Sequence, residues 1–144
     1  MIIRKATGEN IKEIAKIMLD EFSKYPFNEK ASFKDVLKSL LFYFRIGIIY
    51  VAIVKKKIVG VLVFKKEQFW EGKVIIIEDL AVKEEFKGQG IGKNLMKELE
   101  FYAKNKGVKS IYFNSHKKSP SLKFYEKLDY RIMKNTIPMR KKLG

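Results

Sequence analysis

Three of the chain's nine glycines alternate within residues 86–95, where Gly88, Gly90 and Gly92 stand in the stretch FKGQGIGKNL. A β-branched apolar run precedes this stretch, and apolar residues at helical spacing follow it from Leu95, so the pattern predicts a strand-to-helix turn. The N–H groups at such a helix start are unpaired and carry the positive end of the helix dipole, and glycine lets a ligand approach them. We expect a phosphate group to bind there. The alternative is an ordinary tight turn whose lysines point into water.

Two familiar phosphate-binding motifs do not fit these glycines. A P-loop ending at Gly92-Lys93 requires glycine at position 87 and serine or threonine at position 94, but the chain has Lys87 and Asn94. The dinucleotide fingerprint G-x-G-x-x-G also fails, since position 93 or 95 would have to be glycine and neither is. The turn therefore belongs to another class of phosphate site.

Residues 77–95 closely resemble the acetyl-coenzyme A motif of the GNAT family of N-acetyltransferases, R/Q-x-x-G-x-G/A after an apolar strand. Residues 87–92, KGQGIG, fit this motif with lysine in the first position. Downstream, residues 121–130, SLKFYEKLDY, are similar to the family block A/S-x-x-F-Y-x-x-x-G-F, although Asp129 replaces the usual glycine and Lys118 stands where the family often has asparagine. The resemblance covers essentially the whole chain.

The resemblance implies that acetyl-coenzyme A is the acetyl donor and that the acceptor is a primary amine, belonging either to a small molecule or to a protein N-terminus or lysine. It also implies that the strand before the turn pairs with pantetheine and that the turn holds the pyrophosphate. The implied cofactor-binding residues are Leu80, Ala81, Val82, Lys87, Gly88, Gln89, Gly90, Ile91, Gly92, Lys93, Asn114, Ser121 and Phe124.

Acetyl transfer to an amine needs a base, a donor for the developing oxyanion and a proton for the leaving thiolate. Tyr125 occupies the place of the family's tyrosine acid, although it also fits a core aromatic position. Glu78 and Asp79 should point to opposite faces of their strand. The resemblance favours Glu78 as the base, while Asp79, a bound water or a purely structural carboxylate pair remain alternatives. A backbone N–H within residues 80–82 is the expected oxyanion donor.

Other side chains are weaker candidates. His116 follows the predicted fifth strand, where a loop role is favoured over that of a base. Phe22, Tyr25 and Phe27 form one candidate wall for an acceptor pocket. Phe69 and Trp70 form another, although hairpin aromatics packed on the sheet are an equally favoured interpretation of these two residues.

Composition limits the chemistry. The 144 residues include no cysteine and one histidine, which excludes a cysteine-bound acyl group and a multi-histidine metal site, so we expect direct transfer and no metal. We expect one domain, 1–144. The longest apolar run, 46–54, is about half of a bilayer span, and no secretory pattern opens the chain, which predicts a cytoplasmic protein without a membrane segment.

The formal net charge of +15 raises the question of nucleic-acid binding. The basic residues are scattered, however, and only four of the 31 are arginine, so a solvated basic surface is the favoured interpretation. This charge argues mildly against strongly cationic acceptors. The leading hypothesis is an N-acetyltransferase that works as a monomer or homodimer. The alternatives are a non-catalytic acyl-coenzyme A sensor and, less favoured, a nucleic-acid binder.

The pattern of elements predicts an α/β fold, GNAT-like, with a mixed, mostly antiparallel central sheet of about six to seven strands and helices on both faces. Strands 73–82 and 109–114 should be parallel neighbours. A helix capped by Thr7, a second begun by Ser32 and a third ended by Gly107 are expected. The expected strands are 2–5, 48–54, 58–64, 73–82, 109–114, 130–133 and 137–140, and the last helix is expected over 119–128.

Overall fold

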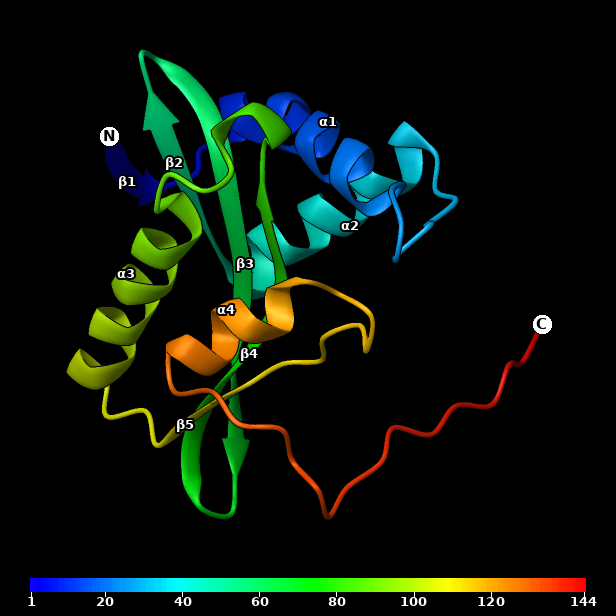
Figure 1. Ribbon diagram of the computed structural model, residues 1–144, viewed down its shortest axis with the longest axis vertical. Coiled ribbons are helices and arrows are strands. Elements are labelled where there is room, and N and C mark those ends of the chain that lie inside the picture. The colour runs from blue at the N-terminus through cyan, green and yellow to red at the C-terminus, as the bar shows by residue number, and fades with distance from the viewer.

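A single mixed β-sheet forms the centre of the computed structural model, which describes residues 1–144 (Figure 1). Its strands follow one another in space in chain order, and every neighbouring pair is antiparallel except the last, β4 and β5, which are parallel as predicted. The strands are β1 (Ile2–Lys5), β2 (Ile48–Val54), β3 (Lys57–Phe69), β4 (Gly72–Val82) and β5 (Ser110–Tyr112).

Helices cover both faces of this sheet, which confirms the predicted layering. On one face α1 (Ile11–Phe22) and α2 (Phe33–Ile46) enclose a core of apolar side chains, and on the other α3 (Ile91–Asn105) and α4 (Ser121–Lys127) pack over a second core. Two short 3-10 turns, η1 (Gly8–Asn10) and η2 (Glu84–Phe86), precede α1 and the glycine turn. None of these helices is long and apolar enough to cross a bilayer.

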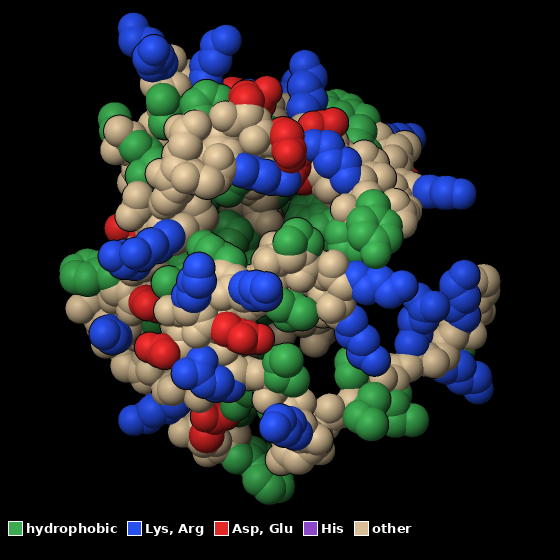
Figure 2. All heavy atoms as spheres, viewed as in Figure 1, with side chains coloured by type: hydrophobic (Ala, Val, Ile, Leu, Met, Phe, Trp, Pro, Cys, Tyr) green, Lys and Arg blue, Asp and Glu red, His purple; other side chains and the backbone are tan.

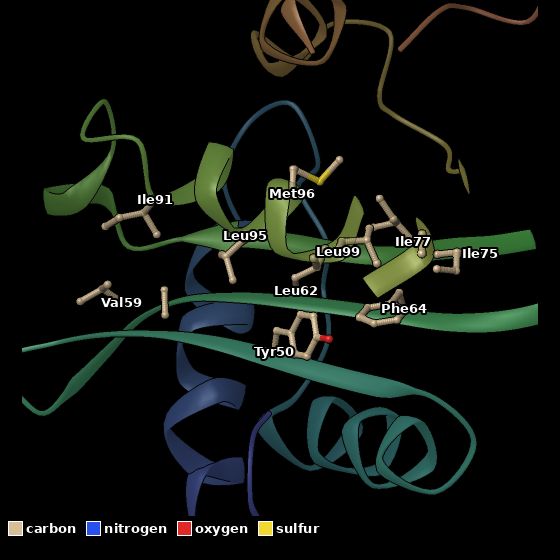
Figure 3. Close-up of a cluster of buried hydrophobic side chains, with 12 residues drawn as sticks. Tyr50, Val59, Leu62, Phe64, Ile75, Ile77, Ile91, Leu95, Met96 and Leu99 are labelled. Carbon is tan, nitrogen blue, oxygen red and sulfur yellow. The ribbon is translucent and has the colours of Figure 1, made fainter. Parts of the chain in front are cut away.

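The seating of α3 on the sheet fixes where its N-terminus lies. Ile91, Leu95 and Leu99 lie on the side of α3 that faces β2 to β4 (Figure 3). Gly60 of β3 lies beneath them, and a Cβ at that position would stand 2.9 Å from Ile91 Cγ2. The missing side chain therefore lets α3 approach the sheet closely, and the start of the helix is held beside the end of β4.

The helix ends follow the predicted local signals. The Asp35 N–H donates to Ser32 Oγ at 3.1 Å and the Ser32 N–H donates to Asp35 Oδ2 at 3.2 Å, which forms the capping box that starts α2. Gly107 adopts a φ of 69° just after α3, as expected for its end. Thr7 differs, since it caps η1 and the α-helix begins only at Ile11.

The prediction of six to seven strands is wrong, because the sheet has five. Residues 130–133 and 137–140 form no strand, and the chain beyond Tyr130 extends away from the body (Figure 1). Tyr130 itself is anchored, since its hydroxyl donates to Glu100 Oε2 at 2.8 Å. A further strand would need ladder partners and burial, but β5 spans only Ser110–Tyr112 and the apolar tail residues, such as Ile137 and Met139, are exposed among basic ones.

Candidate active site

The edge of β4 is open at its carboxyl end. Its pairing with β5 ends at Ile76, whereas β4 continues to Val82. The Lys83 N–H donates to the Val59 carbonyl of β3 at 2.8 Å, so by strand alternation the N–H groups of Leu80 and Val82 point to the opposite, open edge. This stretch of backbone can pair with an extended ligand.

The glycine turn presents a row of free N–H groups. Gly88 and Gly90 adopt φ values of 77° and 83°, in the left-handed region that glycine favours. The first hydrogen bond inside α3 runs from the Asn94 N–H to the Gly90 carbonyl, and no N–H from Gly88 through Lys93 has a partner in the protein. The predicted strand-to-helix turn is thus confirmed, and it forms a cradle suited to an anion.

A cavity of about 1280 Å³ connects this turn with the open end of β4, the α1–α2 segment and α4. Figure 2 shows it as a hollow with hydrophobic side chains at its floor and acidic and basic side chains side by side above it. Of the residues predicted from the sequence to bind cofactor or catalyse, all line the cavity except Gln89. The Gln89 side chain turns back instead, and its Nε2 donates to the Glu85 carbonyl at 3.3 Å.

Lys87, the first residue of the motif, is not a free cation. Its Nζ contacts Glu21 Oε1 and lies 2.8 Å from Glu84 Oε2, while Lys24 Nζ lies 2.8 Å from Glu21 Oε2. Burial opposes the charge of Lys87, but the hydrogen bonds to Glu21 and Glu84 outweigh it and raise the pKa of Lys87. The turn is therefore tied to α1, and the Lys87 charge is already paired with carboxylates, whereas the backbone N–H groups of the turn are free.

Sequence reasoning missed Glu21, although a signal was present. Its side chain is buried and lines the cavity. It lies seven residues after Ile14 and three after Met18, which places a carboxylate on the apolar face of α1. A charged residue on a buried helix face usually has a partner, and here the partners are Lys24 and Lys87.

The expectation that Glu78 and Asp79 point to opposite faces is wrong. Phe64 pairs with Ile77 but Val63 with Asp79, so Glu78 forms a β-bulge in β4. Ile77 accordingly packs in the core under α3, whereas Ala81, four residues later, packs in the core under α1 and α2. The extra residue at the bulge turns both carboxylates toward the α1–α2 side of the cavity.

The two carboxylates differ in their surroundings. Glu78 Oε1 lies 3.4 Å from Lys65 Nζ and is close to Tyr43 of α2, whose pKa is raised to about 12, mainly by burial. Asp79 makes no ion pair or side-chain hydrogen bond. Burial, together with the charges of Glu78 and Glu29, raises the pKa of Asp79 to about 6. Asp79 therefore exchanges its proton close to neutral pH.

Tyr125 lies on α4, where its position is compatible with both roles considered from the sequence. Its ring packs against Phe113 and Phe124, with centroid distances of 4.5 and 5.1 Å, and the residue also lines the cavity. Burial raises the pKa of Tyr125 to about 12, so its hydroxyl stays protonated at physiological pH. His116 lies in the loop before α4, as expected, and its Nδ1 accepts a hydrogen bond from the Lys118 N–H at 3.1 Å.

Only one of the two candidate aromatic walls belongs to the cavity. Phe22, Tyr25 and Phe27 line it, and the Phe27 ring packs edge-on against Phe22 at a centroid distance of 5.1 Å. The expectation for Phe69 and Trp70 is wrong, since they lie at the β3–β4 hairpin outside the cavity and the Trp70 side chain is fully exposed. The hairpin extends past the helices and gives Trp70 nothing to pack on.

Asp129, which stands where the second family block has glycine, adopts a backbone conformation that glycine favours. Its φ is 68°, a left-handed value that aspartate tolerates better than most residues. The turn after α4 is thus preserved, and Tyr130 follows it to pack beside Tyr125 at a centroid distance of 6.3 Å.

Comparison with solved structures shows the same fold in several acetyltransferases. A protein from Clostridium difficile 630 described as a possible acetyltransferase has a TM-score of 0.86 at 18% identity, with 99% of this chain and 98% of that chain covered. An aminoglycoside acetyltransferase from an uncultured soil metagenomic sample has a TM-score of 0.76 at 20% identity, with 99% of this chain and 96% of that chain covered. The aminoglycoside 6′-N-acetyltransferase of Acinetobacter haemolyticus gives 0.82 at 13% identity, with both chains fully covered.

Sequence comparison supplies the family. No curated protein matches the sequence. The Acetyltransferase (GNAT) family, in contrast, matches residues 11–130, a range that contains the open edge of β4, the glycine turn and α4. The chain therefore belongs to the GNAT family of acetyltransferases.

Proposed function

We propose that this protein is an acetyl-coenzyme A-dependent N-acetyltransferase that moves an acetyl group directly to a primary amine, with residues 1–144 acting as one catalytic domain. One observation supports this most strongly: the free N–H groups from Gly88 to Lys93 open onto the same cavity as Asp79 and Tyr125. Donor binding and proton transfer can therefore take place in one connected space.

The donor half of the cavity offers backbone rather than side-chain contacts. The free N–H groups of the turn bind the pyrophosphate at the start of α3. The N–H groups of Leu80 and Val82 at the open edge of β4 pair with the pantetheine arm as an added strand would. Asn114, Ser121 and Phe124 face this edge from the β5–α4 side and line the same space.

A base must help the acceptor lose its proton. An amine with a pKa of ~10.4 is almost entirely protonated at pH 7, so its neutral form is scarce. Glu78 is the base that the resemblance implies, but its carboxylate is already engaged in an ion pair with Lys65. Asp79, with a pKa of about 6 and no partner, is better suited, and we assign it the role of base, with Glu78 as the neighbour that helps raise its pKa.

The transfer passes through no cysteine-bound acyl group, because the chain has no cysteine. The amine nitrogen bonds to the acetyl carbonyl carbon while the carbon–sulfur bond breaks. An N–H group of Leu80 or Val82 donates to the carbonyl oxygen as negative charge develops on it. Asp79 takes the proton from the amine, and the Tyr125 hydroxyl donates a proton to the departing sulfur and regains one from solvent.

A thiol-release assay with acetyl-coenzyme A and a panel of amines, amino acids and peptides tests the proposal. We expect coenzyme A release with at least one amine, and a product heavier by one acetyl group in mass spectrometry. Tight binding of acetyl-coenzyme A without turnover on any acceptor would instead establish the sensor alternative. Indifference to coenzyme A, combined with nucleic-acid affinity that falls steeply with salt, would establish a nucleic-acid binder.

A further inference from the structure

We propose that the acceptor carries a second positive charge in addition to the amine that is acetylated, and that Glu29 and Asp35 recognise it. This inference rests on the proposed function and concerns the acceptor end of the same cavity, defined as the part lined by the α1–α2 segment, the start of α2 and the bulge of β4. It names a substrate class, amines with two or more cationic groups.

Charges are segregated along the cavity. Lys87 and Lys93 flank the glycine turn and Lys127 lies on α4, all at the donor end. Lys24 lies in the α1–α2 segment, but its charge is already paired with Glu21 at 2.8 Å and with Asp20 and Glu84 at 3.6 Å. Apart from the paired Lys24, the acceptor end is lined by carboxylates and by no lysine or arginine. These carboxylates are Glu29, Asp35, Glu78 and Asp79.

Basic residues nearby do not neutralise this acceptor end. Lys65 lies outside the lining and pairs with Glu78 at 3.4 Å. Lys38, one turn along α2, acts weakly on Asp35, whose pKa is lowered mainly by hydrogen bonds from Ser32. Asp35 therefore stays ionised, and Glu29 has no ion pair, so both remain available to a cationic ligand.

An aromatic wall stands beside these carboxylates. Phe22, Tyr25 and Phe27 line the same end, and the Glu29 N–H donates to the Phe22 carbonyl at 2.8 Å, which fixes Glu29 next to the wall. Aromatic faces attract ammonium groups and carboxylates bind them, so the two together favour a cationic ligand. The proximity of Glu29 to Asp79, whose pKa it helps raise, connects this wall with the proposed base.

The net charge of +15 predicts the opposite preference, because it repels cations at long range. Surface charges beyond about 10 Å are largely screened in physiological salt, whereas the cavity carboxylates act at contact distance. The local charge of the acceptor end should therefore decide which amine is bound.

Three six-carbon acceptors test the inference: 1,6-diaminohexane, hexylamine and 6-aminohexanoate. They share one reactive amine and differ at the far end, which is cationic, neutral or anionic. We expect kcat/KM to fall in that order, with the diamine about tenfold above hexylamine after its two equivalent amines are allowed for, and with a smaller preference at high salt. Calorimetric binding of the three compounds to the coenzyme A-loaded protein gives the same ranking without depending on turnover.

Two variants locate the effect. Glu29→Gln and Asp35→Asn should each reduce the ratio of diamine to hexylamine kcat/KM about two- to fivefold. The ratio is measured at pH 8, well above the pKa of Asp79 of about 6, so that the loss of the Glu29 charge does not change the ionisation of the base. Glu98→Gln, which removes an exposed carboxylate of α3 outside the cavity, should leave the preference intact. Equal binding and turnover of hexylamine and the diamine, or an unchanged preference in both variants, would overturn the inference. Failure of the proposed function looks different, since no acceptor would then be acetylated even if the binding order held.

Discussion

The two ends of the cavity are built from different materials. The donor end consists of backbone: the left-handed glycines Gly88 and Gly90, the unpaired N–H groups behind them and the open edge of β4. The proposed acceptor end consists of side chains from separate elements. The aromatic wall and Glu29 lie at the end of α1 and in the segment after it, Asp35 lies on α2, and Glu78 and Asp79 lie on β4. The first depends on local conformation, and the second on how distant elements pack.

This difference bears on how each end can change. A backbone cradle binds the same phosphate group whatever the neighbouring side chains are, so the donor end restricts only glycine positions. Side chains at the acceptor end can vary without disturbing that cradle. One fold can therefore keep its donor and change its acceptor, which is why the acceptor must be inferred from the charges and rings of this chain alone.

Removal of the proposed acid should have the largest effect. Tyr125→Phe keeps the ring that packs on Phe113 and Phe124 but deletes the hydroxyl. We expect kcat to fall by roughly 10²–10⁴ while affinity for acetyl-coenzyme A stays nearly unchanged. Steady-state kinetics and calorimetry provide the two values, and a wild-type kcat would reduce Tyr125 to a packing residue.

The base is tested by the pH dependence of kcat/KM. Asp79 must be ionised to accept a proton, so wild-type activity should rise with pH through about 6, where its raised pKa lies. Asp79→Asn should lose roughly 10²-fold at pH 7 and abolish this inflection. Glu78→Gln removes the neighbouring charge that raises the pKa of Asp79, and so should move the inflection to lower pH.

The opposite result would change which of the two carboxylates, Glu78 or Asp79, is assigned as the base. If Glu78→Gln abolished the inflection and Asp79→Asn kept it, then the base would be Glu78, as the family resemblance suggests. If both variants kept wild-type profiles, then neither carboxylate would be the base, and a bound water would take that role.

The smallest effect is expected at Lys87, the one charged side chain of the motif that is already paired. Lys87→Gln introduces the other residue that the family motif accepts at this position. It should weaken acetyl-coenzyme A binding only a few-fold, because the Lys87 ammonium is already paired with Glu21 and Glu84 and the backbone N–H groups of the turn remain. A loss of more than about a hundredfold in calorimetry would show that the Lys87 charge, rather than the backbone, carries the phosphate.

The sequence predicted the donor end well because its determinants are local. Glycine spacing, the strand before it and the helix after it lie within residues 74–103, and the turn formed where this pattern placed it. The bulge at Glu78 was missed because it depends on pairing with a different strand, β3. The periodicity of α1 places Glu21 on an apolar face, but its partner Lys87 lies in a segment distant in the chain. The prediction of the final strands is wrong for a similar reason. Residues 130–140 have a suitable β pattern, but the edge strand β5 is too short for another strand to pair with it.

The central claim, that unpaired backbone N–H groups at the glycine turn bind acetyl-coenzyme A, is tested most directly by calorimetry on two matched variants. Gly90 and Gly107 both adopt left-handed φ values, 83° and 69°, yet only Gly90 lies in the turn. A Cβ at Gly107 would meet open space, and a Cβ at Gly90 would meet only Asn94 Nδ2, at a van der Waals distance of 4.0 Å. Both Gly90→Val and Gly107→Val therefore introduce backbone strain at one end of α3, and circular dichroism should show that both still fold. We expect Gly90→Val to weaken acetyl-coenzyme A binding by well over about tenfold while Gly107→Val binds like the wild type. Unchanged affinity in a folded Gly90→Val protein would contradict the account.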